Sequence, residues 1–459
     1  MGQLSIVIMA AGKGTRMKSA RPKVLHTLAG RSLLQHVLNA VAGLGADRTL
    51  LVVGHEADAV RASVAGSGAT CVLQEPQLGT GHAVQQVVPH LPDAGTTLVL
   101  NGDVPLIQAD TAAALAAASG GKKLALLTVE MADPAGYGRI VRDPSQGDAV
   151  RAIVEHKDAS DAQRAIREVY TGILAAPTAW LKRAVKGLTN DNAQREYYLT
   201  DIVAVAEREG LPVVAVPAHD EFEVTGVNSA TQLAELERRF QRRQAERLME
   251  EHGVRFADPS RFDLRGTLAC GRDVFIDVGC VFEGNVTLDD DVTISAHCVI
   301  RNSRIEAGAL IQPFTHMTDA VIGPRAEVGP FARLRPGAQL GAEVHIGNFV
   351  EIKNSTLARG AKANHLAYVG DATVGERVNY GAGSITANYD GAFKHRTVIG
   401  NDVHVGSNCV LVAPVTVAEG ATIGAGSTIS KDAPAGQLTV ARAKQVSIQG
   451  WSRPKKAAK

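Results

Sequence analysis

A six-residue repeat in the second half of the chain restricts its fold more than any other feature of the sequence. Beyond Phe262, apolar residues recur six positions apart in three blocks, and Gly, Ala, Asp or Asn often follows them. The blocks are Ile276, Phe282, Leu288, Ile294 and Ile300; Ile322, Val328, Leu334, Leu340, Ile346 and Ile352; and Ile399, Val405, Leu411, Val417, Ile423 and Ile429. A period of six is not helical. It predicts a parallel β-helix with three repeats per coil and every apolar side chain pointing inward.

The composition agrees with a narrow, tightly turned interior. Phe, Trp and Tyr make up only 4% of the 459 residues, whereas Gly accounts for 46 of them. Small interior residues explain the shortage of aromatic rings. Lys and Arg number 48 and Asp and Glu 47, so the net charge is +1. This balance argues against charge-driven binding of nucleic acid by the chain as a whole.

The six-residue repeat is interrupted twice. One interruption spans residues 356–368, and the other spans 380–396, where residues 388–391 (Asn-Tyr-Asp-Gly) resemble a loop thrown out of the coil. Breaks in a solenoid are common places for function. We therefore expect functional residues in both interruptions.

The first half of the chain lacks this repeat and has a different pattern of apolar and polar residues. Short apolar runs alternate with amphipathic stretches, which predicts helices packed on a buried, mostly parallel sheet. The runs are 4–10, 49–53, 97–101, 124–130, 173–176 and 212–217. Residues 230–252 contain neither Gly nor Pro and predict one long, charged helix ended by Gly253. We expect an α/β domain over 1–229, a linker helix over 230–252, and a β-helix domain with a C-terminal tail over 253–459.

Cysteine spacing and hydropathy indicate a reduced protein without membrane spans. The five cysteines are scattered and form no CxxC pair. We expect mostly buried thiols, Cys298 and Cys409 included, in a cytoplasmic protein. No stretch approaches the roughly 20 apolar residues of a membrane-spanning helix. Residues 1–11 lack a positively charged start and a cleavage site, so they indicate a first strand rather than a signal peptide.

A glycine-rich turn follows the first apolar run and carries features of a phosphate-binding site. Residues 9–17 read Met-Ala-Ala-Gly-Lys-Gly-Thr-Arg-Met. Gly12 and Gly14 would let backbone N–H groups approach phosphate oxygens closely. Arg16 and Lys23 would add positive charge suited to a triphosphate. The spacing matches neither a Walker A loop nor the dinucleotide-binding fingerprint.

Several segments together resemble the signature of sugar-1-phosphate nucleotidyltransferases. They are residues 9–17 with Lys23, Gln74 with Leu-Gly-Thr-Gly-His-Ala at 78–83, and Asn-Gly-Asp-Val-Pro-Leu at 101–106. Within that group, Gly-Tyr-Gly-Arg at 136–139, Glu-His-Lys at 155–157 and Gly-Val-Asn at 226–228 resemble the bacterial bifunctional N-acetylglucosamine-1-phosphate uridylyltransferase/glucosamine-1-phosphate acetyltransferase family. The resemblance covers essentially the whole chain. It implies a Rossmann-like α/β domain, a left-handed parallel β-helix, Mg²⁺, and acetyl-CoA as co-substrate.

The resemblance also implies roles for residues of the N-terminal half. Asp103 and Asn228 would hold Mg²⁺, and an Asp at a strand end suits such a hard ion. Arg16 and Lys23 would be catalytic, stabilising charge while the sugar phosphate attacks the α-phosphorus of UTP and pyrophosphate leaves. The residues expected to bind UTP or UDP-N-acetylglucosamine are Met9, Ala10, Ala11, Gly12, Lys23, Gln74, Gly79, Thr80, Asn101, Gly102, Asp103, Gly138, Glu155, Tyr170 and Asn228.

Two positions depart from the pattern of that family. Asn101 stands where a Tyr is more usual before Gly-Asp, and Tyr170 stands where an Asn is usual before Thr171 and Gly172. Tyr170 would therefore replace one sugar contact. Thr171 or the backbone could supply that contact instead, or the loop could be placed differently.

Three residues of the repeat half suit acetyl transfer to an amine. Arg335 and Lys353 are cations in adjoining coils and suit a sugar phosphate. His365 falls in the first interruption, and a group with a pKa near neutrality is needed to take the proton of an amine. His365 matches the catalytic His of hexapeptide acyltransferases. By the same resemblance, Tyr368 and Asn379, with Arg335 and Lys353, would bind glucosamine-1-phosphate, and acetyl-CoA would contact Ala382, Asn388, Tyr389, Ser407, Ala425 and Arg442.

The sequence therefore predicts two catalytic domains in one chain. The C-terminal domain would acetylate glucosamine-1-phosphate, and the N-terminal domain would couple the product to UTP, supplying a precursor for peptidoglycan and lipopolysaccharide. The resemblance implies a homotrimer with acetyl-transfer sites between subunits, and we expect release and rebinding of the intermediate. Two alternatives stay open: a single-activity nucleotidyltransferase with a structural β-helix, and a non-catalytic scaffold.

Overall fold

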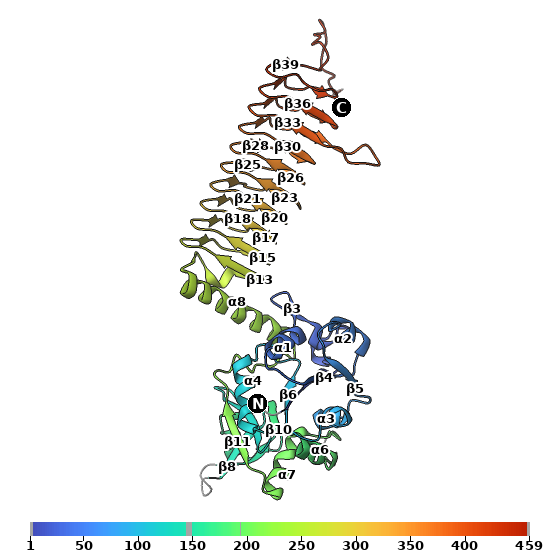
Figure 1. Cartoon of the computed structure of the whole chain (residues 1–459), viewed down its shortest axis with the longest axis vertical. Coiled ribbons are helices and arrows are strands. Elements are labelled where there is room, and N and C mark those ends of the chain that lie inside the picture. Colours follow the sequence, from blue (N-terminus) through green and yellow to red (C-terminus); the bar gives the residue numbers. More distant parts are fainter. Residues whose placement is uncertain (1–2, 144–148, 193, 457–459) are drawn as a thin grey trace. The chain divides into compact units, whose positions relative to one another are not determined.

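The computed structural model describes residues 3–143, 149–192 and 194–456, which form two compact units, 1–239 and 240–459 (Figure 1). The extreme ends of the expected N- and C-terminal domains lie outside the described residues. Helix α8 (Ala230–His252) contributes to both units. Its Glu237 accepts a hydrogen bond from the Ala29 backbone in the first unit, and its Gln241 exchanges hydrogen bonds with the Leu264 backbone in the second. No helix within the described ranges is long and apolar enough to cross a membrane.

The first unit is built on one mixed sheet with the strand order β11-β7-β10-β6-β1-β4-β5. Strands β1, β4, β5 and β6 run parallel to one another, whereas β10 runs antiparallel to β6 and β7. The strands are β1 Leu4–Met9, β4 Arg48–Val53, β5 Thr70–Leu73, β6 Thr96–Asn101, β7 Leu124–Glu130, β10 Glu168–Pro177 and β11 Val213–Pro217. The six predicted apolar runs all fall on these strands. Strand β5 was not predicted, nor were the antiparallel pair of β8 (Arg139–Asp143) and β9 (Ala149–Val154) and the small pair of β2 (Thr27–Leu28) and β3 (Arg31–Ser32).

Helices cover both faces of this sheet. One buried cluster joins α1 and α4 to one face of the strands, and a second joins α3, α6 and α7 to the other face. The helices are α1 Leu33–Val41, α2 Ala57–Ser63, α3 Thr80–Val87, α4 Ala109–Ser119, α5 Asp161–Arg164, α6 Thr178–Lys186 and α7 Ile202–Glu209. This layered arrangement confirms the Rossmann-like α/β prediction for the N-terminal half.

The second unit is a parallel β-helix, as the six-residue repeat predicts (Figure 1). One face of the coils is formed by β12 Arg255–Phe256, β14 Phe275–Ile276, β16 Thr293–Ile294, β19 Leu310–Ile311, β22 Glu327–Val328, β25 His345–Asn348, β28 Lys362–His365, β31 Asn379–Tyr380, β34 His404–Val405, β37 Thr422–Ile423 and β39 Leu438–Thr439. The other two faces are formed by β13 Phe262–Cys270, β15 Cys280–Leu288, β17 Val299–Arg301, β18 Arg304–Ile305, β20 His316–Thr318, β21 Val321–Ile322, β23 Arg333–Leu334, β24 Gln339–Leu340, β26 Glu351–Lys353, β27 Thr356–Leu357, β29 Tyr368–Gly370, β30 Ala372–Val374, β32 Ile385–Ala387, β33 Thr397–Ile399, β35 Val410–Val412, β36 Val415–Val417 and β38 Thr428–Ile429.

The repeat positions form the core of the β-helix. All of the predicted inward-facing residues are at most 3% exposed. Ile294, Ile311, Val328 and Ile346 lie in register on consecutive coils, so a coil contains 17 or 18 residues. Each apolar side chain therefore stacks on its counterpart in the next coil.

One of the two predicted interruptions is wrong. Residues 356–368 form no break, because β27, β28 and β29 continue the coil without an insertion. Ala363 occupies the inward position and is fully buried, so the repeat continues there. The sequence pattern missed it because Ala was not counted among the large apolar residues that define the repeat. The second interruption, predicted over residues 380–396, is confirmed only for residues 388–396, which leave the coil between β32 and β33; residues 380–387 stay in the coil, and the strands on either side of the loop remain in register.

Candidate active sites

A turn at the end of β1 brings the cations of the N-terminal half to one place. The backbone at Gly14 has a φ of +59° and leads into the short turns Thr15–Met17 and Lys23–Leu25. A Cβ atom on Gly14 would lie 2.7 Å from the Cβ of Lys23. Glycine is therefore needed both for the left-handed backbone and for the close approach of Lys23.

Four predicted residues meet beyond the ends of β1 and β6. The Lys23 ammonium forms an ion pair with Asp103 Oδ2 and donates a hydrogen bond to Asn228 Oδ1 over 3.1 Å. Arg16 Nη2 donates to the same Asn228 oxygen over 2.9 Å. The backbone N–H of Val227 donates to the Asp103 carbonyl and fixes the two segments together. The sequence prediction that these residues share a site agrees with this geometry.

The oxygen atoms of this cluster fit a magnesium ion. Asp103 Oδ2 and Asn228 Oδ1 both face one positive group, the Lys23 ammonium. Within the described residues, no group of three or more His, Cys, Asp or Glu side chains could hold a metal. Mg²⁺ is commonly held by one or two protein oxygens, with substrate phosphates and water completing the shell. The donor set of Asp103 and Asn228 is of that kind.

The predicted base-recognition segment lies at the end of β5 and the start of α3. Gln74 is buried and donates to the Gly79 carbonyl over 3.0 Å. Gly79 has a φ of +101°, and a Cβ there would lie 2.7 Å from the Tyr197 carbonyl oxygen. Thr80 Oγ1 accepts a hydrogen bond from the Leu199 backbone over 3.1 Å. These contacts bring Gln74, Gly79 and Thr80 together as the sequence indicates.

A cavity of about 250 Å³ lies beside these residues. It includes several predicted sugar-binding residues, together with Tyr137, Tyr198 and Thr200, which the sequence reasoning did not select. The lining is Met9, Thr80, Asn101, Gly136, Tyr137, Gly138, Glu155, Tyr170, Thr171, Gly172, Tyr198, Leu199 and Thr200. Burial, with Asp158 and Asp201 nearby, raises the pKa of the Glu155 carboxyl. The cavity is thus partly apolar with a few polar groups, as small-ligand sites usually are.

Four of the predicted acetyl-transfer residues, His365, Ala382, Ser407 and Ala425, form one column along the β-helix with Asn348, which was not predicted. Asn348, His365, Ala382, Ser407 and Ala425 occupy the same turn of consecutive coils. Backbone hydrogen bonds join each residue of this column to the next coil. The N–H donors and their carbonyl acceptors are Leu366 to Asn348, Gly383 to His365, Asn408 to Ala382 and Gly426 to Ser407. The first two steps between column residues span 17 positions, and the last two are longer. The column therefore carries one of these residues on each coil.

His365 is held by a residue that the sequence reasoning missed. Its Nδ1 lies 2.8 Å from Asn348 Oδ1, and His365 pairs with Asn348 between β25 and β28. Because an amide oxygen only accepts hydrogen bonds, Nδ1 is the donor in this pair, and in the neutral imidazole Nε2 is then the acceptor. The prediction that His365 lies in a break of the solenoid is wrong, because β28 is an unbroken strand. Asn348 could have been found from the sequence, because it precedes His365 by 17 residues, which is the length of one coil.

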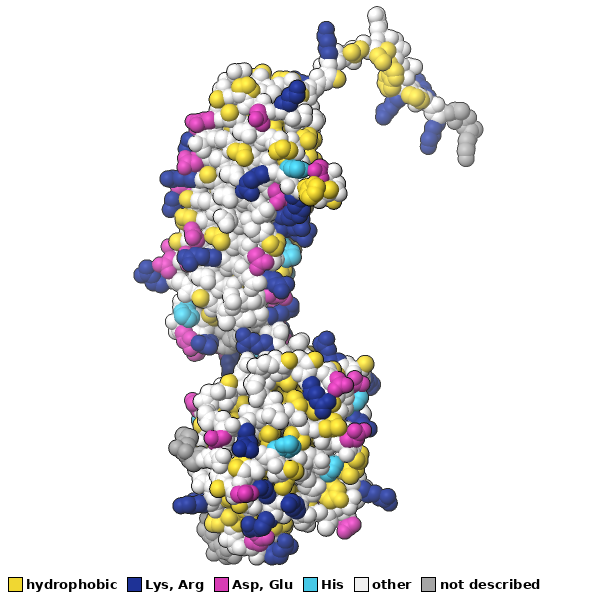
Figure 2. Space-filling model, turned by 45° about the vertical axis from the view of Figure 1, so that its right-hand side comes forward, with side chains coloured by type: hydrophobic (Ala, Val, Ile, Leu, Met, Phe, Trp, Pro, Cys, Tyr) yellow, Lys and Arg dark blue, Asp and Glu magenta, His cyan; other side chains and the backbone are white. Residues whose placement is uncertain are grey.

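The expected phosphate-binding cations lie on adjoining coils, each beside a carboxylate. Arg335 Nη1 pairs with Glu351 Oε1 at 2.9 Å, and Lys353 Nζ lies 3.4 Å from Asp371 Oδ2. Lys394, in the projecting loop, lies next to Lys353, which lowers the pKa of Lys394. Figure 2 shows Lys and Arg side chains gathered on the β-helix beside this loop. The sequence reasoning did not select Lys394.

The remaining predicted contacts are arranged around the same coils. Asn388 is buried and donates to Asp371 Oδ2 and, over 3.4 Å, to the Tyr368 hydroxyl. Tyr389 donates to the Gly391 carbonyl within the loop. Arg442 Nη1 donates to the Ala425 carbonyl over 2.7 Å. Asn379 lies on β31, one coil beyond β28 and in register with Lys362; within the described part of the chain its side chain makes no hydrogen bond to the other predicted residues.

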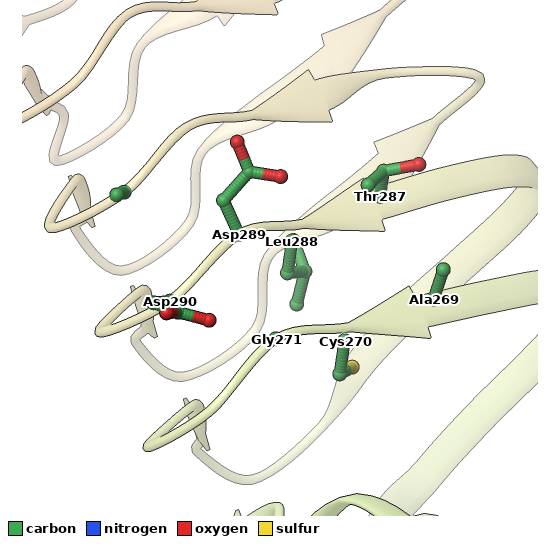
Figure 3. A pocket seen from close by; sticks show the side chains of 8 residues that line it. Ala269, Cys270, Gly271, Thr287, Leu288, Asp289 and Asp290 are labelled. Atoms are coloured by element: carbon green, nitrogen blue, oxygen red, sulfur yellow. The ribbon is translucent and has the colours of Figure 1, made fainter.

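Another cavity, of about 420 Å³, lies among the first coils of the β-helix and includes no predicted site residue (Figure 3). Asp290 pairs with Arg272 and Asp289 with Arg304, so both carboxylates are already neutralised. Burial raises the pKa of the Cys270 thiol to about 12, which disfavours a reactive thiolate. All five cysteines are free thiols, of which Cys280, Cys298 and Cys409 are buried.

Comparison with known proteins decides the family. Residues 6–170 match the model of the MobA-like NTP transferase domain, and residues 317–417 match that of the GMPPB C-terminal domain. A bifunctional protein GlmU from Methylibium petroleiphilum is 71% identical over 458 residues, which cover 99% of both chains. The chain belongs to the GlmU family. GlmU proteins from Albidiferax ferrireducens and Paracidovorax citrulli are each 63% identical over at least 99% of this chain and all of their own length.

Family membership confirms the bifunctional prediction. As a GlmU protein, the chain is a bifunctional nucleotidyltransferase and acetyltransferase of UDP-N-acetylglucosamine synthesis, and the alternative of a single activity with a structural β-helix is not favoured. A solved nucleotidyl transferase from Methanothermobacter covers 52% of this chain and 99% of its own at 20% identity. Its TM-score of 0.38 is too low to support an argument.

Proposed function

We propose that the two clusters described above are the two active sites of the GlmU reactions. The β-helix site acetylates glucosamine-1-phosphate with acetyl-CoA, and the N-terminal site then couples N-acetylglucosamine-1-phosphate to UTP. The observation that carries this proposal is the convergence of chemically matched residues at two separate places. Cations and oxygen ligands suited to a metal meet at the ends of β1 and β6. The β-helix carries His365, held by Asn348 at the end of β28, and carboxylate-paired cations on a different face of neighbouring coils.

In the N-terminal site, the protein positions the substrates and stabilises charge. Arg16 and Lys23 hold the phosphates of UTP while a phosphate oxygen of the sugar phosphate attacks the α-phosphorus and pyrophosphate leaves. Asp103 and Asn228 hold Mg²⁺, which when bound neutralises charge on the phosphates. Release of Lys23 from Asp103 frees both groups for these roles. Gln74, Gly79 and Thr80 take the base and its ribose.

In the β-helix site, His365 acts as the general base. Its Nε2 accepts a proton from the amine of glucosamine-1-phosphate while the amine nitrogen attacks the thioester carbonyl of acetyl-CoA, and the coenzyme A thiolate leaves. Donation from Nδ1 to Asn348 keeps the lone pair on Nε2 and holds the ring in orientation. Arg335, Lys353 and Lys394 bind the phosphate of the sugar. A backbone N–H at Ala382 is suited to stabilise the oxyanion.

Acetyl-CoA lies along the coils in this proposal. Ser407 and Ala425 continue the turn column beyond Ala382, and Arg442 is already held against the Ala425 carbonyl. Asn388 and Tyr389 belong to the projecting loop at the other side of the same coils. One contact per coil matches a long, extended co-substrate.

We further propose a cytoplasmic homotrimer with acetyl-transfer sites between subunits. An exposed column supports a second copy as partner: Phe314, Phe331, Phe349 and Leu366 are 47–63% exposed on consecutive coils. The three Phe rings stack 4.9 and 5.4 Å apart, and Leu366 directly follows His365. An apolar column next to the proposed base suits an interface better than solvent. The five free thiols agree with a reducing compartment.

The test uses two assays on one preparation with Mg²⁺. Free thiol release follows acetyl transfer, and pyrophosphate release follows uridylyl transfer from supplied N-acetylglucosamine-1-phosphate. We expect His365→Ala to abolish thiol release and leave pyrophosphate release intact, and Asp103→Ala to do the reverse. If either variant abolishes both activities in a folded protein, or neither, the assignment of two separate sites is wrong.

A further inference from the structure

Asp371 lies where the projecting loop leaves and rejoins the coil. It directly follows β29 and is 7% exposed. Asn388, the first residue of the loop, donates a side-chain hydrogen bond to Asp371 Oδ2. At the other end of the loop, the Thr397 backbone N–H donates to the Asp371 carbonyl over 3.2 Å. One residue therefore contacts both ends of the loop.

The same carboxylate also holds a cation of the proposed phosphate site. Lys353 Nζ lies 3.4 Å from Asp371 Oδ2, and Asn354 Nδ2 donates to Asp371 Oδ1 over 2.6 Å. Lys394, from the projecting loop, lies next to Lys353, and two neighbouring ammonium groups repel each other. The negative charge of Asp371 acts on both ammonium groups and offsets this repulsion. The cation cluster therefore contains its own counter-charge.

The hydrogen bonds of Asp371 require an ionised carboxylate. Its three side-chain partners, Lys353, Asn354 and Asn388, are all donors. Burial raises the pKa of the Asp371 carboxyl, but these donors and the Lys353 charge outweigh burial, so the pKa lies below its ordinary value. An Asn at this position would turn its NH₂ group toward one of the donors in either orientation of the amide. Charge and shape are thus both matched to an Asp.

We propose that Asp371 is a positioning residue for acetyl transfer, which fixes the projecting loop and the Lys353 ammonium relative to each other. Asn388 belongs to the acetyl-CoA contacts and Lys353 to the sugar-phosphate contacts, so one carboxylate governs the binding of both substrates without touching either. An ammonium has three donors, so Lys353 held by Asp371 still has donors for a phosphate. This proposal rests on the assignment of the acetyl-transfer site given above.

The test is Asp371→Asn, which removes the charge and keeps the size of the side chain. Thiol release gives KM for glucosamine-1-phosphate and KM for acetyl-CoA. We expect both KM values to rise about tenfold or more, the effect of losing hydrogen bonds to a charged group. We expect kcat to stay within about threefold, because the variant leaves His365 and Asn348 untouched. A rise in only one KM, or in neither, would overturn the proposal.

Asp319→Asn is the matched control. Asp319 occupies the same corner of the β-helix three coils earlier, with Gly337 and Asn354 on the coils between. It has the same left-handed backbone, with a φ of +47° against +50° for Asp371. This variant should leave both KM values unchanged. Equal rises in the two variants would show a general loosening of the β-helix and refute the positioning role.

A double variant tests whether Asp371 acts through Lys353. Lys353→Met alone should raise KM for glucosamine-1-phosphate and leave KM for acetyl-CoA unchanged. Adding Asp371→Asn to it should raise KM for acetyl-CoA but not raise KM for the sugar phosphate further, because a residue that acts through another is not additive with it. Fully independent effects on KM for the sugar phosphate would contradict the proposal.

A smaller change keeps the proposal testable if Asp371→Asn does not fold, as judged by circular dichroism. Asn354→Gly removes the donor to Asp371 Oδ1, and a glycine already occupies this corner one coil earlier, at Gly337 with a φ of +82°. We expect both KM values to rise about 2- to 12-fold, the effect of one hydrogen bond. Unchanged KM values in a folded Asn354→Gly protein would contradict the proposal.

Limited proteolysis tests the hold on the loop without turnover. Tyr389 and Phe393 are 61% and 71% exposed in the loop, so chymotrypsin has access to both. We expect faster cleavage there in Asp371→Asn, identified by the masses of the two fragments, and cleavage at the wild-type rate in Asp319→Asn. An unchanged rate in Asp371→Asn would show that the carboxylate does not hold the loop.

Two further readouts separate this proposal from the function on which it rests. Pyrophosphate release by the same preparations reports on the N-terminal unit and should be unchanged in every variant. If wild-type protein released no thiol from glucosamine-1-phosphate and acetyl-CoA, the assigned function would fail. If wild type is active and Asp371→Asn has the KM values of wild type, only the positioning role fails.

Discussion

Replacing Asn348 by Ala tests how much the orientation of His365 contributes to acetyl transfer. The pair stands in register between β25 and β28, with 2.8 Å between Asn348 Oδ1 and His365 Nδ1. Truncation leaves Nδ1 to water, so the imidazole can rotate and exchange tautomers. Asn348 does not itself touch the acetyl group in the proposed mechanism. It acts through His365 as a positioning residue.

The size of the effect follows from one hydrogen bond. A net contribution of about 0.5–1.5 kcal/mol corresponds to a fall in kcat of about 2- to 12-fold. General-base catalysis itself supplies about 10²- to 10⁴-fold, so Asn348→Ala should be clearly milder than His365→Ala. KM for glucosamine-1-phosphate and for acetyl-CoA should change little, because the phosphate cations and the turn column are untouched.

The assay is thiol release over a range of both substrates, with pyrophosphate release as an internal control. Asn401→Ala is the matched variant, because Asn401 Oδ1 also accepts a 2.8 Å hydrogen bond across coils, from the Glu376 backbone, away from His365. It should leave kcat for acetyl transfer unchanged. Equal losses in Asn348→Ala and Asn401→Ala would show a general loosening of the β-helix and refute the positioning role. So would an unchanged kcat in Asn348→Ala.

Four further predictions concern the two sites and their assembly. Gly14→Ala forces a Cβ against Lys23 at positive φ, at about 1–3 kcal/mol, and should raise KM for UTP without affecting thiol release. Burial raises the pKa of Glu155, so the folded protein is more stable when this carboxyl is protonated, and that stability is lost as pH rises through the raised pKa. Glu155→Gln removes the buried charge, so it should raise the melting temperature more at pH 8 than at pH 4. Lys394→Met should raise KM for glucosamine-1-phosphate about tenfold and spare kcat for uridylyl transfer. Phe349→Asp should reduce the mass in light scattering from about three times 48.2 kDa to that of one chain, and a trimer that survives would exclude this column from the interface.

The fold could be predicted where one physical constraint repeats. Every coil of the β-helix needs an apolar side chain at each inward position, so the sequence carries that signal many times. The break predicted at residues 356–368 was wrong, because Ala363 satisfies the same inward position with a methyl group. The break predicted at 380–396 was too long, because residues 380–387 continue the coil. In the N-terminal half, most buried strands could be predicted because each is a short run of apolar residues in the sequence. The hairpin of β8 and β9 could not, because its partly exposed strands mix charged and apolar residues.

The motif residues of the candidate sites could be predicted because each has a chemical role that few residue types fill. Lys23, Asp103 and Asn228 meet as the sequence suggested. Residues that act through a neighbour were missed. In the sequence, nothing distinguishes Asn348 and Lys394 from other polar residues. Asn348 gains its role from its contact with His365, and Lys394 from its contact with Lys353.

A parallel β-helix turns a distance in sequence into a distance in space, and this explains where its chemistry lies. Residues one coil apart are neighbours, so Asn348 supports His365 across 17 positions and Lys353 meets Asp371 across 18. The coil that carries the projecting loop is longer, with 25 residues from Tyr380 to Val405, yet these two residues still stack in register. The insertion is therefore accommodated at a corner without disturbing the core. A loop can thus add Asn388, Tyr389 and Lys394 to a rigid wall, so binding groups are gained while the column that positions His365 is kept.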